Sequence, residues 1–566
     1  MRLNVSIFRF QNSESKQVAG RTQIHSELMS DTSNVKTIPD LLFSVLCCLL
    51  LTSNIIAATY TNPIIYADYS DPDAIRVDND YYMTASSFNC FPGLQILHST
   101  DLVNWTIVNA ALPKSYCKEQ DVEHGNLVWA PSLRYHNNRF YIFWGDPDRG
   151  IYYISTRDIR SSWSEPQLLI EGKGYIDPCP YWQGDTLYIV HALAGSRAGL
   201  KSVLLMATLT VSSKKNERSN HTWLLTDHRI IFDGHRDNPT CEGPKIYFRN
   251  GYYYIFTPAG GVATGWQLVL RSNNIYGPYE QRIVLRQGNT TVNGPHQGAW
   301  VDTPEGEHWF LHFQDVGALG RIVHLQPMTW QDDWPVIGNN GQPVGKHKVP
   351  KNCKGQRLPQ DTIINFTHSK LDYSWQYPHS PDSKWHYCDA ANGLLRLYSV
   401  PMPDHAPNLW NQPNMLLRKI DAPELTITAK VHFQPHEKIM GERAGLLIMG
   451  LDYAAIMLEK TDQGVEIYST QCIKANKGTA ETQQDRQAIN TEWVYLKVQI
   501  ADEKAQFAYS TDNKQYISLG DEFILKEGVW IGAKYGFVCT RPPLSSLKTR
   551  NDGGNIDIDY LEINYK

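Results

Sequence analysis

The chain lacks the marks of several common protein classes. Its ten cysteines show no Cys-x-x-Cys spacing, so neither a zinc site nor a disulfide framework is indicated. Charges of both signs are scattered along the chain and sum to a formal −5, which argues against a nucleic-acid partner. No glycine-rich phosphate loop lies between a strand and a helix, so no nucleotide or redox cofactor is implied.

Aromatic residues are abundant instead. The 566 residues include 31 tyrosines, 17 phenylalanines and 16 tryptophans. Aromatic side chains favour β-sheet, and their flat apolar faces also suit sugar rings. Composition alone leaves both uses open. The chain is too long for one ordinary hydrophobic core, so several domains are expected.

The first 58 residues are predicted to be a leader. The segment LLFSVLCCLLLTSNIIAA, from Leu41 to Ala58, is almost wholly apolar. It fits a signal peptide cleaved near Ala58, with Met29 as a second candidate start. It could also be a retained membrane anchor, because a spanning helix needs about 20 apolar residues. We expect export to the periplasm, cell surface or extracellular space, with membrane contact only if the leader is retained.

Short aromatic strands recur in five similar units over residues 59–340. Each unit has an aromatic strand, a gap, a second strand and a polar turn, as in FYIFWGD followed by IYYISTRDIRSSW. The units repeat at roughly 45–65 residues, a period typical of propellers and arrays. Helical periodicity is almost absent. This pattern predicts a five-bladed β-propeller whose innermost strands line a central channel.

A second domain is predicted after a linker. Residues 341–361 are rich in proline, glycine and lysine and poor in apolar side chains, which is typical of a linker. Residues 362–566 then alternate cleanly in strands such as LTITAKVHF and NIDIDYLEI. That pattern favours a β-sandwich of the jelly-roll, lectin-like kind, so the predicted fold class is all-β.

Three predicted blades begin with a carboxylate followed by Pro or Gly-Pro. These residues are Asp71 in SDPD, Asp177 in IDPCP and Glu242 in CEGPK. Equivalent positions in neighbouring blades should meet at one end of the channel. Like charges brought together shift one another's pKa values, and split values suit acid–base chemistry at a glycosidic bond. Glu242 is the predicted proton donor, and the proline after Asp71 predicts an extended backbone at Asp71.

An ordered set of motifs resembles glycoside hydrolase family 43. The set comprises NPIIYADYSDPDAIRV, SSFNCFPGLQILHSTDLVNW, VWAPSLRY, IDPCPYW, CEGPKIY, NGPHQGAW and GRIVHLQPMTWQDDWPVIG. It most resembles the branch of exo-acting β-xylosidases and α-L-arabinofuranosidases that carry a C-terminal sandwich. The resemblance runs from about Asn62 to the end of the chain.

The resemblance implies a role for each carboxylate. Asp71 matches the general base that activates a water, and Glu242 matches the general acid that protonates the leaving oxygen. Asp177 matches the aspartate that modulates the pKa of the acid and orients it. The family inverts the anomeric carbon, so base and acid should stand about 6.5–9.5 Å apart. Asp73 is the alternative base within the same motif.

The resemblance also implies residues that bind the sugar. Phe88 matches a pocket aromatic, with a place in the propeller core as the alternative. Trp129 is expected either to stack on the sugar or to form the channel wall. Arg321 matches an arginine that holds sugar hydroxyls, because its guanidinium fork suits paired hydroxyls and offsets carboxylate charge. Arg197 is a weaker candidate for the same task, and a structural ion pair is the alternative for either arginine.

No cofactor is required by this interpretation, although calcium is a candidate. His296 matches a histidine that faces the channel, where family members hold a calcium ion or water. One imidazole does not make a calcium site, because calcium takes six to eight oxygen ligands. Asp559 is a second candidate in the sandwich, with a solvated turn as its alternative. The sandwich is expected to close over the pocket through Phe537.

The sequence therefore predicts an exo-acting glycosidase. Its expected substrates carry terminal β-D-xylose or α-L-arabinofuranose, as in oligosaccharides from xylan, arabinoxylan and arabinan of plant cell walls. Three alternatives stay open: a carbohydrate-binding protein without activity, a scaffold propeller, and an endo-arabinanase. The three carboxylates argue against the first two, since neither needs converging acids.

Overall fold

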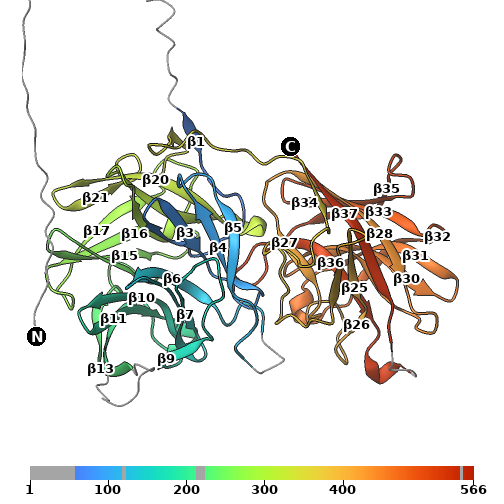
Figure 1. Cartoon of the computed structure of the whole chain (residues 1–566), viewed down its shortest axis with the longest axis horizontal. Helices are drawn as coiled ribbons and strands as arrows, with labels where there is room; N and C mark the ends of the chain where they lie inside the picture. Colours follow the sequence, from blue (N-terminus) through green and yellow to red (C-terminus); the bar gives the residue numbers. More distant parts are fainter. Residues whose placement is uncertain (1–57, 118–122, 212–222, 548–551) are drawn as a thin grey trace, which may run out of the picture. The chain divides into compact units, whose positions relative to one another are not determined.

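The computed structural model describes residues 58–117, 123–211, 223–547 and 552–566. The predictions made for residues 1–57, including the signal peptide and the anchor, lie outside these ranges. The described residues form one compact unit whose regular secondary structure is almost entirely β-strand (Figure 1). No helix in the described ranges is long and apolar enough to cross a membrane.

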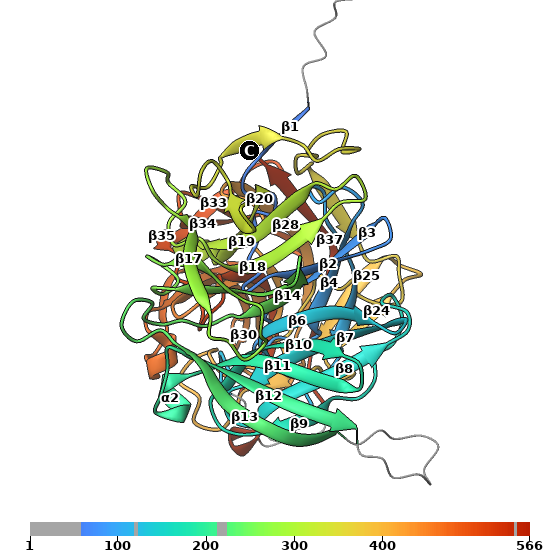
Figure 2. The same ribbon diagram turned by 90° about the vertical axis from the view of Figure 1, so that its left-hand side faces the viewer.

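Five antiparallel four-stranded sheets form the propeller, and they follow one another along the chain (Figures 1 and 2). The innermost strand of the first blade, β2 (Asp73–Val77), contacts the innermost strands of the second and fifth blades, β6 (Trp129–His136) and β18 (His296–Asp302). The blades are β2 (Asp73–Val77), β3 (Asp80–Thr84), β4 (Gly93–Ser99), β5 (Thr106–Leu112); β6 (Trp129–His136), β7 (Arg139–Asp146), β8 (Gly150–Thr156), β9 (Gln167–Glu171); β10 (Tyr175–Gln183), β11 (Thr186–Leu193), β12 (Val203–Val211), β13 (Trp223–Asp233); β14 (Lys245–Arg249), β15 (Tyr252–Ala259), β16 (Trp266–Ser272), β17 (Glu280–Arg286); and β18 (His296–Asp302), β19 (His308–Asp315), β20 (Arg321–Gln331), β21 (Trp334–Ile337).

The propeller core lies between blades. Alternate side chains of one strand point to opposite faces of its sheet, so each blade presents apolar side chains to both neighbours. Leu94 and Ile96 of β4 pack with Ile142 and Trp144 of β7 in one such cluster. Burial of each aliphatic side chain of this size contributes about 1.5–3 kcal/mol. The aromatic repeat therefore serves inter-blade packing over most of its length.

The predicted linker contains a strand. β22 (Lys346–Lys348) pairs antiparallel with β1 (Thr59–Thr61) at the start of the described chain. Tyr60 donates its hydroxyl to the Leu325 carbonyl at 2.7 Å, which ties this pair to the last blade. Three-residue strands that pair across such a sequence distance leave no periodic pattern, and this is why composition pointed to an unstructured connection.

Two sheets form the C-terminal sandwich, which with the propeller confirms the predicted all-β fold class. Their apolar faces meet in a single large cluster that includes Phe537. One sheet contains β23 (Thr362–Asn365), β24 (His386–Asp389), β25 (Leu394–Tyr398), β28 (Leu425–Gln434), β33 (Trp493–Ala501), β34 (Lys504–Ser510), β35 (Ile517–Ile524) and β37 (Asn555–Tyr565); the other contains β26 (Val400–Pro401), β27 (Leu416–Lys419), β29 (Arg443–Met449), β30 (Tyr453–Thr461), β31 (Gly464–Cys472), β32 (Thr482–Ile489) and β36 (Lys534–Arg541).

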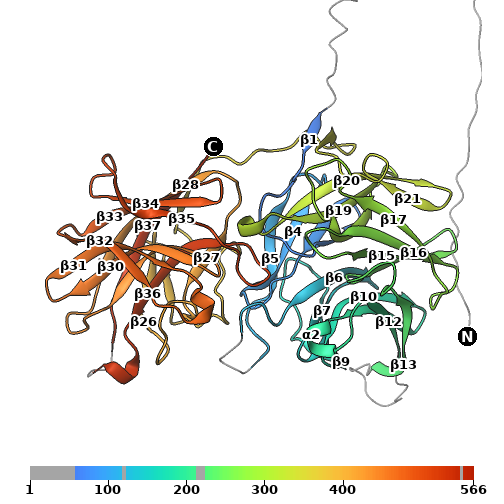
Figure 3. The ribbon, with the colours of Figure 1, turned by 180° about the vertical axis from the view of Figure 1, so that it is seen from behind.

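The sandwich contacts the loop that precedes β4. Phe91 and Tyr377 exchange two backbone hydrogen bonds of 2.9 and 2.6 Å, and Asn89 donates its side-chain amide to the Pro378 carbonyl at 2.8 Å. β27 lies on the side of the sandwich next to the propeller (Figures 1 and 3). These contacts fix the SSFNCFPG loop, which carries Phe88.

Candidate active site

One cavity of about 280 Å³ brings the three predicted carboxylates together. Asp71 precedes β2, Asp177 lies in β10, and Glu242 precedes β14. The remaining two blades contribute Trp129 at the start of β6 and Gln297 near the start of β18. All five blades therefore supply a residue from the same end of their innermost strands. The lining residues are Asp71, Phe88, Trp129, Ala130, Ile176, Asp177, Thr240, Glu242, Gly261, Val262, Gln297, Arg321 and Trp530.

Asp71 is held from two sides. Ser86 donates its hydroxyl to Asp71 Oδ2 at 2.6 Å, and Arg321 Nη1 lies 3.5 Å from Asp71 Oδ1. The side chains of Asp71 and Arg321 are both only 10% exposed. An ionised carboxylate held by a hydroxyl and a guanidinium is a fixed proton acceptor, which suits a general base.

Asp73 occupies a different environment. Its carboxylate lies outside the cavity, where Oδ2 accepts hydrogen bonds from Arg134 Nη1 at 2.6 Å and from the Leu133 amide at 2.7 Å. The Asp73 side chain is fully buried. This ion pair joins β2 to β6 and therefore stabilises the junction between two blades.

Asp177 is placed to orient the predicted acid. Its Oδ2 accepts the amide of Gly243, the residue after Glu242, at 2.8 Å. Burial raises the pKa of the Asp177 carboxyl well above its ordinary value, and the nearby Glu242 and Asp71 raise it further. Gly243 has a φ of 58°, and a Cβ there would lie 2.6 Å from the Gln297 side chain, so glycine is required at this turn.

Glu242 is the most solvent-accessible of the three carboxylates, with 27% of its side chain exposed. Its Oε1 lies 3.1 Å from His296 Nε2. His296 itself is buried, so the imidazole fixes one oxygen of Glu242 while the carboxyl reaches the cavity. A proton donor needs both constraint and access to the leaving oxygen.

Aromatic rings form one wall of the cavity. The rings of Phe88 and Trp129 meet edge-on at 6.3 Å, and Trp129 meets Trp530 at 6.0 Å. Trp530 belongs to the sandwich, between β35 and β36, and is 51% exposed. The prediction that Phe537 reaches the pocket is wrong, because Phe537 lies fully buried in the sandwich core. Trp530 was missed because its loop carries no periodic pattern.

Unusual backbone conformations gather at this cavity. Non-glycine residues rarely adopt positive φ, and such strain is concentrated at functional sites. The expectation of an extended backbone at Asp71 is wrong, because its φ of 57° lies in the left-handed region. The cavity residues with positive φ are Asp71 (57°), Phe88 (49°), Asp177 (57°), Thr240 (56°), Gln297 (36°) and Trp530 (65°).

Arg197 is not brought to the cavity. It lies in the short helix α2 (Gly195–Ala198), where its Nε donates to Asp148 at 3.0 Å and its Nη2 donates to Asn126 at 3.2 Å. The structure therefore places Arg321 against Asp71 and Arg197 in an ion pair outside the lining.

The calcium candidates have unsuitable surroundings. In the described ranges, no group of three or more His, Cys, Asp or Glu side chains is arranged to hold a metal ion. His296 contacts Glu242 and packs 5.5 Å from the Phe313 ring, which is not the oxygen-rich shell that calcium takes. Asp559 binds the Lys430 ammonium at 2.7 Å. The donor sets do not fit calcium, and no step of the chemistry below involves it.

The fold and the cavity define a class of protein. The cavity at one end of the propeller holds three carboxyls and has an aromatic wall. This arrangement is typical of a glycosidase. The family model for glycosyl hydrolases family 43 matches residues 60–335, and the model for the β-xylosidase C-terminal concanavalin A-like domain matches residues 364–564. The chain belongs to glycoside hydrolase family 43.

The chain is similar to named glycosidases over most of its length. A putative β-xylosidase from Xylanibacter ruminicola is 35% identical over 85% of this chain and 86% of its own length. A non-reducing end α-L-arabinofuranosidase from Bacteroides ovatus is 28% identical over 72% of this chain and 77% of its own length. The solved xylan β-1,4-xylosidase from Bacillus halodurans shares the fold, with a TM-score of 0.76, 22% identity and coverage of 89% of this chain and all of its own.

Proposed function

We propose that the chain removes terminal β-D-xylose or α-L-arabinofuranose from oligosaccharides of plant cell walls by single-displacement inversion. The observation that carries this proposal is the meeting of Asp71, Asp177 and Glu242 in one cavity with an aromatic wall. Relatives named for both sugars support the substrate class. The cavity volume of about 280 Å³ lies at the small end of ligand sites, which favours a single terminal sugar.

The proposed reaction follows from the fixed positions of the carboxyls. Asp71, held by Ser86 and Arg321, takes a proton from a water that attacks the anomeric carbon. Glu242 gives its proton to the departing glycosidic oxygen. Asp177 holds the backbone beside Glu242 and so keeps the acid aimed at that oxygen. The sugar ring stacks on the aromatic wall, and Arg321 offers its remaining N–H groups to hydroxyls.

Product analysis tests the substrate and the position of attack. The purified chain is incubated with reduced xylo-oligosaccharides and arabino-oligosaccharides, and the products are separated by chromatography. Release of single pentoses from the non-reducing end is expected from the first time point. Early appearance of shorter oligosaccharides would indicate an endo-acting enzyme. Binding without hydrolysis would favour a carbohydrate-binding protein, and the absence of both would favour a scaffold.

A further inference from the structure

A second, very small cavity lies behind the predicted general base. Its volume is about 10 Å³, about that of one water molecule. Asp68, Tyr69 and Ser86 of the propeller line one side. Lys419 and Lys534 of the sandwich line the other. The cavity is thus a junction where sandwich side chains meet the segments on either side of Asp71.

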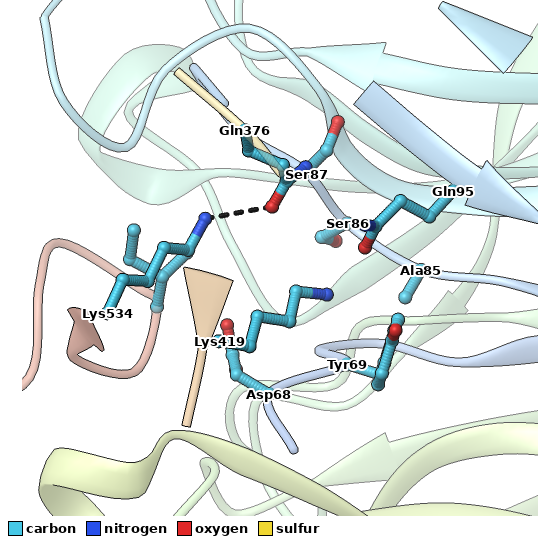
Figure 4. Close-up of a pocket in the computed structure, with 10 residues that line it drawn as sticks. Asp68, Tyr69, Ala85, Ser86, Ser87, Gln95, Gln376, Lys419 and Lys534 are labelled. Atoms are coloured by element: carbon cyan, nitrogen blue, oxygen red, sulfur yellow. Dashed lines mark hydrogen bonds between the residues drawn. The ribbon is translucent and has the colours of Figure 1, made fainter. Parts of the chain in front are cut away.

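The two lysines face each other at the edge of one sheet. Lys419 ends β27 and Lys534 begins β36, and they are directly opposite partners in the antiparallel register. Like charges directly opposite are destabilising, and burial increases that cost. The two ammonium groups take different directions: Lys534 donates to Gln376 at 3.0 Å, whereas Lys419 lies among Asp68, Tyr69 and Ser86 (Figure 4). A partly buried Lys419 ammonium held opposite a second lysine is costly, so a compensating role is expected.

We propose that Lys419 is a positioning residue for the general base, through which the sandwich sets the geometry of Asp71. The inference rests on the proposed function, because it assumes that Asp71 is the base. Lys419 Nζ lies 3.4 Å from the centre of the Tyr69 ring, two residues before Asp71. Asp68 faces the same ammonium from the same segment.

Asp68 and Tyr69 connect this ammonium to Arg321. Asp68 Oδ1 accepts the Arg321 amide at 2.9 Å, and the Tyr69 amide donates to the Arg321 carbonyl at 2.9 Å. The guanidinium of the same arginine lies against Asp71. A displacement of the Asp68–Tyr69 segment therefore moves both the base and its cationic partner.

Ser86 provides the second connection. Its amide donates to the Ser70 carbonyl at 2.9 Å, and its hydroxyl donates to Asp71. The Lys419 cavity is lined by Ser86 as well as by Tyr69. Ser86, one support of Asp71, thus borders the cavity directly, whereas Arg321, the other, is linked to it through Asp68 and Tyr69.

The charge of Lys419 changes near neutral pH. The groups facing it are Asp68, Tyr69, Lys534 and Cys90. Burial is the main cause that lowers the pKa of Lys419 to about 7; Asp68 opposes this shift and Lys534 adds to it. The ammonium is therefore charged below this pH, where it attracts Asp68, and neutral above it. Positioning of Asp71 should weaken as pH rises through this range.

The test compares pH profiles of kcat/KM for an aryl glycoside among wild type, Lys419→Met, Lys534→Met and the double variant. The kcat/KM of the wild type should fall as pH rises, and this alkaline limb of the profile should have an apparent pKa near 7. Lys534→Met removes the opposing charge, so this limb should move upward by about half a pH unit or more. Lys419→Met should abolish the limb and lower kcat/KM about tenfold or more. In the double variant, the Lys534 substitution should have no further effect on the profile.

The outcomes separate this inference from the proposed function. Identical limbs in all four proteins would overturn the role of Lys419, and so would a Lys534 effect that persists without Lys419. If Lys419→Met fails to fold, the direction of the Lys534→Met shift still decides. Asp71→Asn is measured alongside. Full activity of this variant would overturn the proposed base. If Asp71→Asn is inactive but the lysine variants keep the wild-type pH profile, only the positioning role is overturned.

Discussion

At the residue scale, two aspartates of the same motif have different surroundings. Asp71 and Asp73 are two positions apart in one motif, yet one faces the cavity and the other closes a buried ion pair with Arg134. The motif order pointed to Asp71 from sequence. The partner of Asp73 could not be predicted, because Arg134 comes from the next blade and no spacing in the sequence specifies that contact.

Substitutions of the proposed base and the proposed acid should respond differently to the leaving group of the substrate. Asp71→Asn removes the base and should lower kcat by about 10³-fold or more on every substrate. Glu242→Gln removes the proton donor, so its loss should be large on oligosaccharides and small on aryl glycosides whose phenols leave without protonation. Steady-state kinetics over a series of phenols measures this. Equal losses for both variants across the series would contradict the assignment.

Asp73→Asn tests the neighbouring carboxylate as a control. It leaves the buried Arg134 without its ionised partner, which typically costs about 3–5 kcal/mol of unfolding free energy. Denaturant unfolding should show this loss, while kcat of the folded protein stays close to wild type. A stable but inactive Asp73→Asn protein would move the base from Asp71 to Asp73.

Because of Asp177, the free energy of unfolding should decrease as pH rises. Its pKa is raised in the folded protein, so the folded chain binds this proton more tightly than the unfolded chain does. Stability is then lost as pH rises above about 4, the ordinary aspartate value. Asp177→Asn removes this loss. The variant should gain melting temperature over wild type at pH 7, gain less at pH 4.5, and lose activity; a gain that is greater at pH 4.5 would contradict the account.

At the element scale, blade geometry explains why five strand starts meet at one cavity. The five-fold repeat and the carboxylates before Pro or Gly-Pro could be predicted from the sequence, because each blade repeats the same local pattern. The contributions of the sandwich and of the linker could not be predicted from the sequence. Trp530 reaches the cavity from the sandwich, and β22 pairs with β1 ahead of the first blade; both depend on contacts between segments that are distant in sequence.

Trp530 should contribute to substrate binding. Trp530→Ala removes one aromatic surface of the wall and should raise KM about tenfold, with a smaller change in kcat. Trp493→Ala, on strand β33 of the same sandwich, is the matched control and should leave both constants unchanged. Equal kinetics of the Trp530 variant and wild type would show that the sandwich contributes no sugar contact.

At the scale of the whole molecule, the two domains act on one site. The propeller supplies the carboxyls, while the sandwich supplies an aromatic side chain of the wall and packs behind the base. The fold class, the family and the three carboxylates were predictable from sequence, since they follow from repeats and ordered motifs. The inter-domain contacts were not, because a single sequence does not specify which surfaces of two domains meet.

The central claim is that Asp71 and Glu242 act as a base–acid pair on opposite sides of the anomeric carbon. Proton NMR of the first product from aryl β-xyloside and aryl α-arabinofuranoside tests it most directly. The account predicts that the first anomer to appear is inverted, followed by slow mutarotation, because water attacks in a single displacement. A first product of retained configuration would contradict it, since retention requires a carboxylate that attacks the sugar itself.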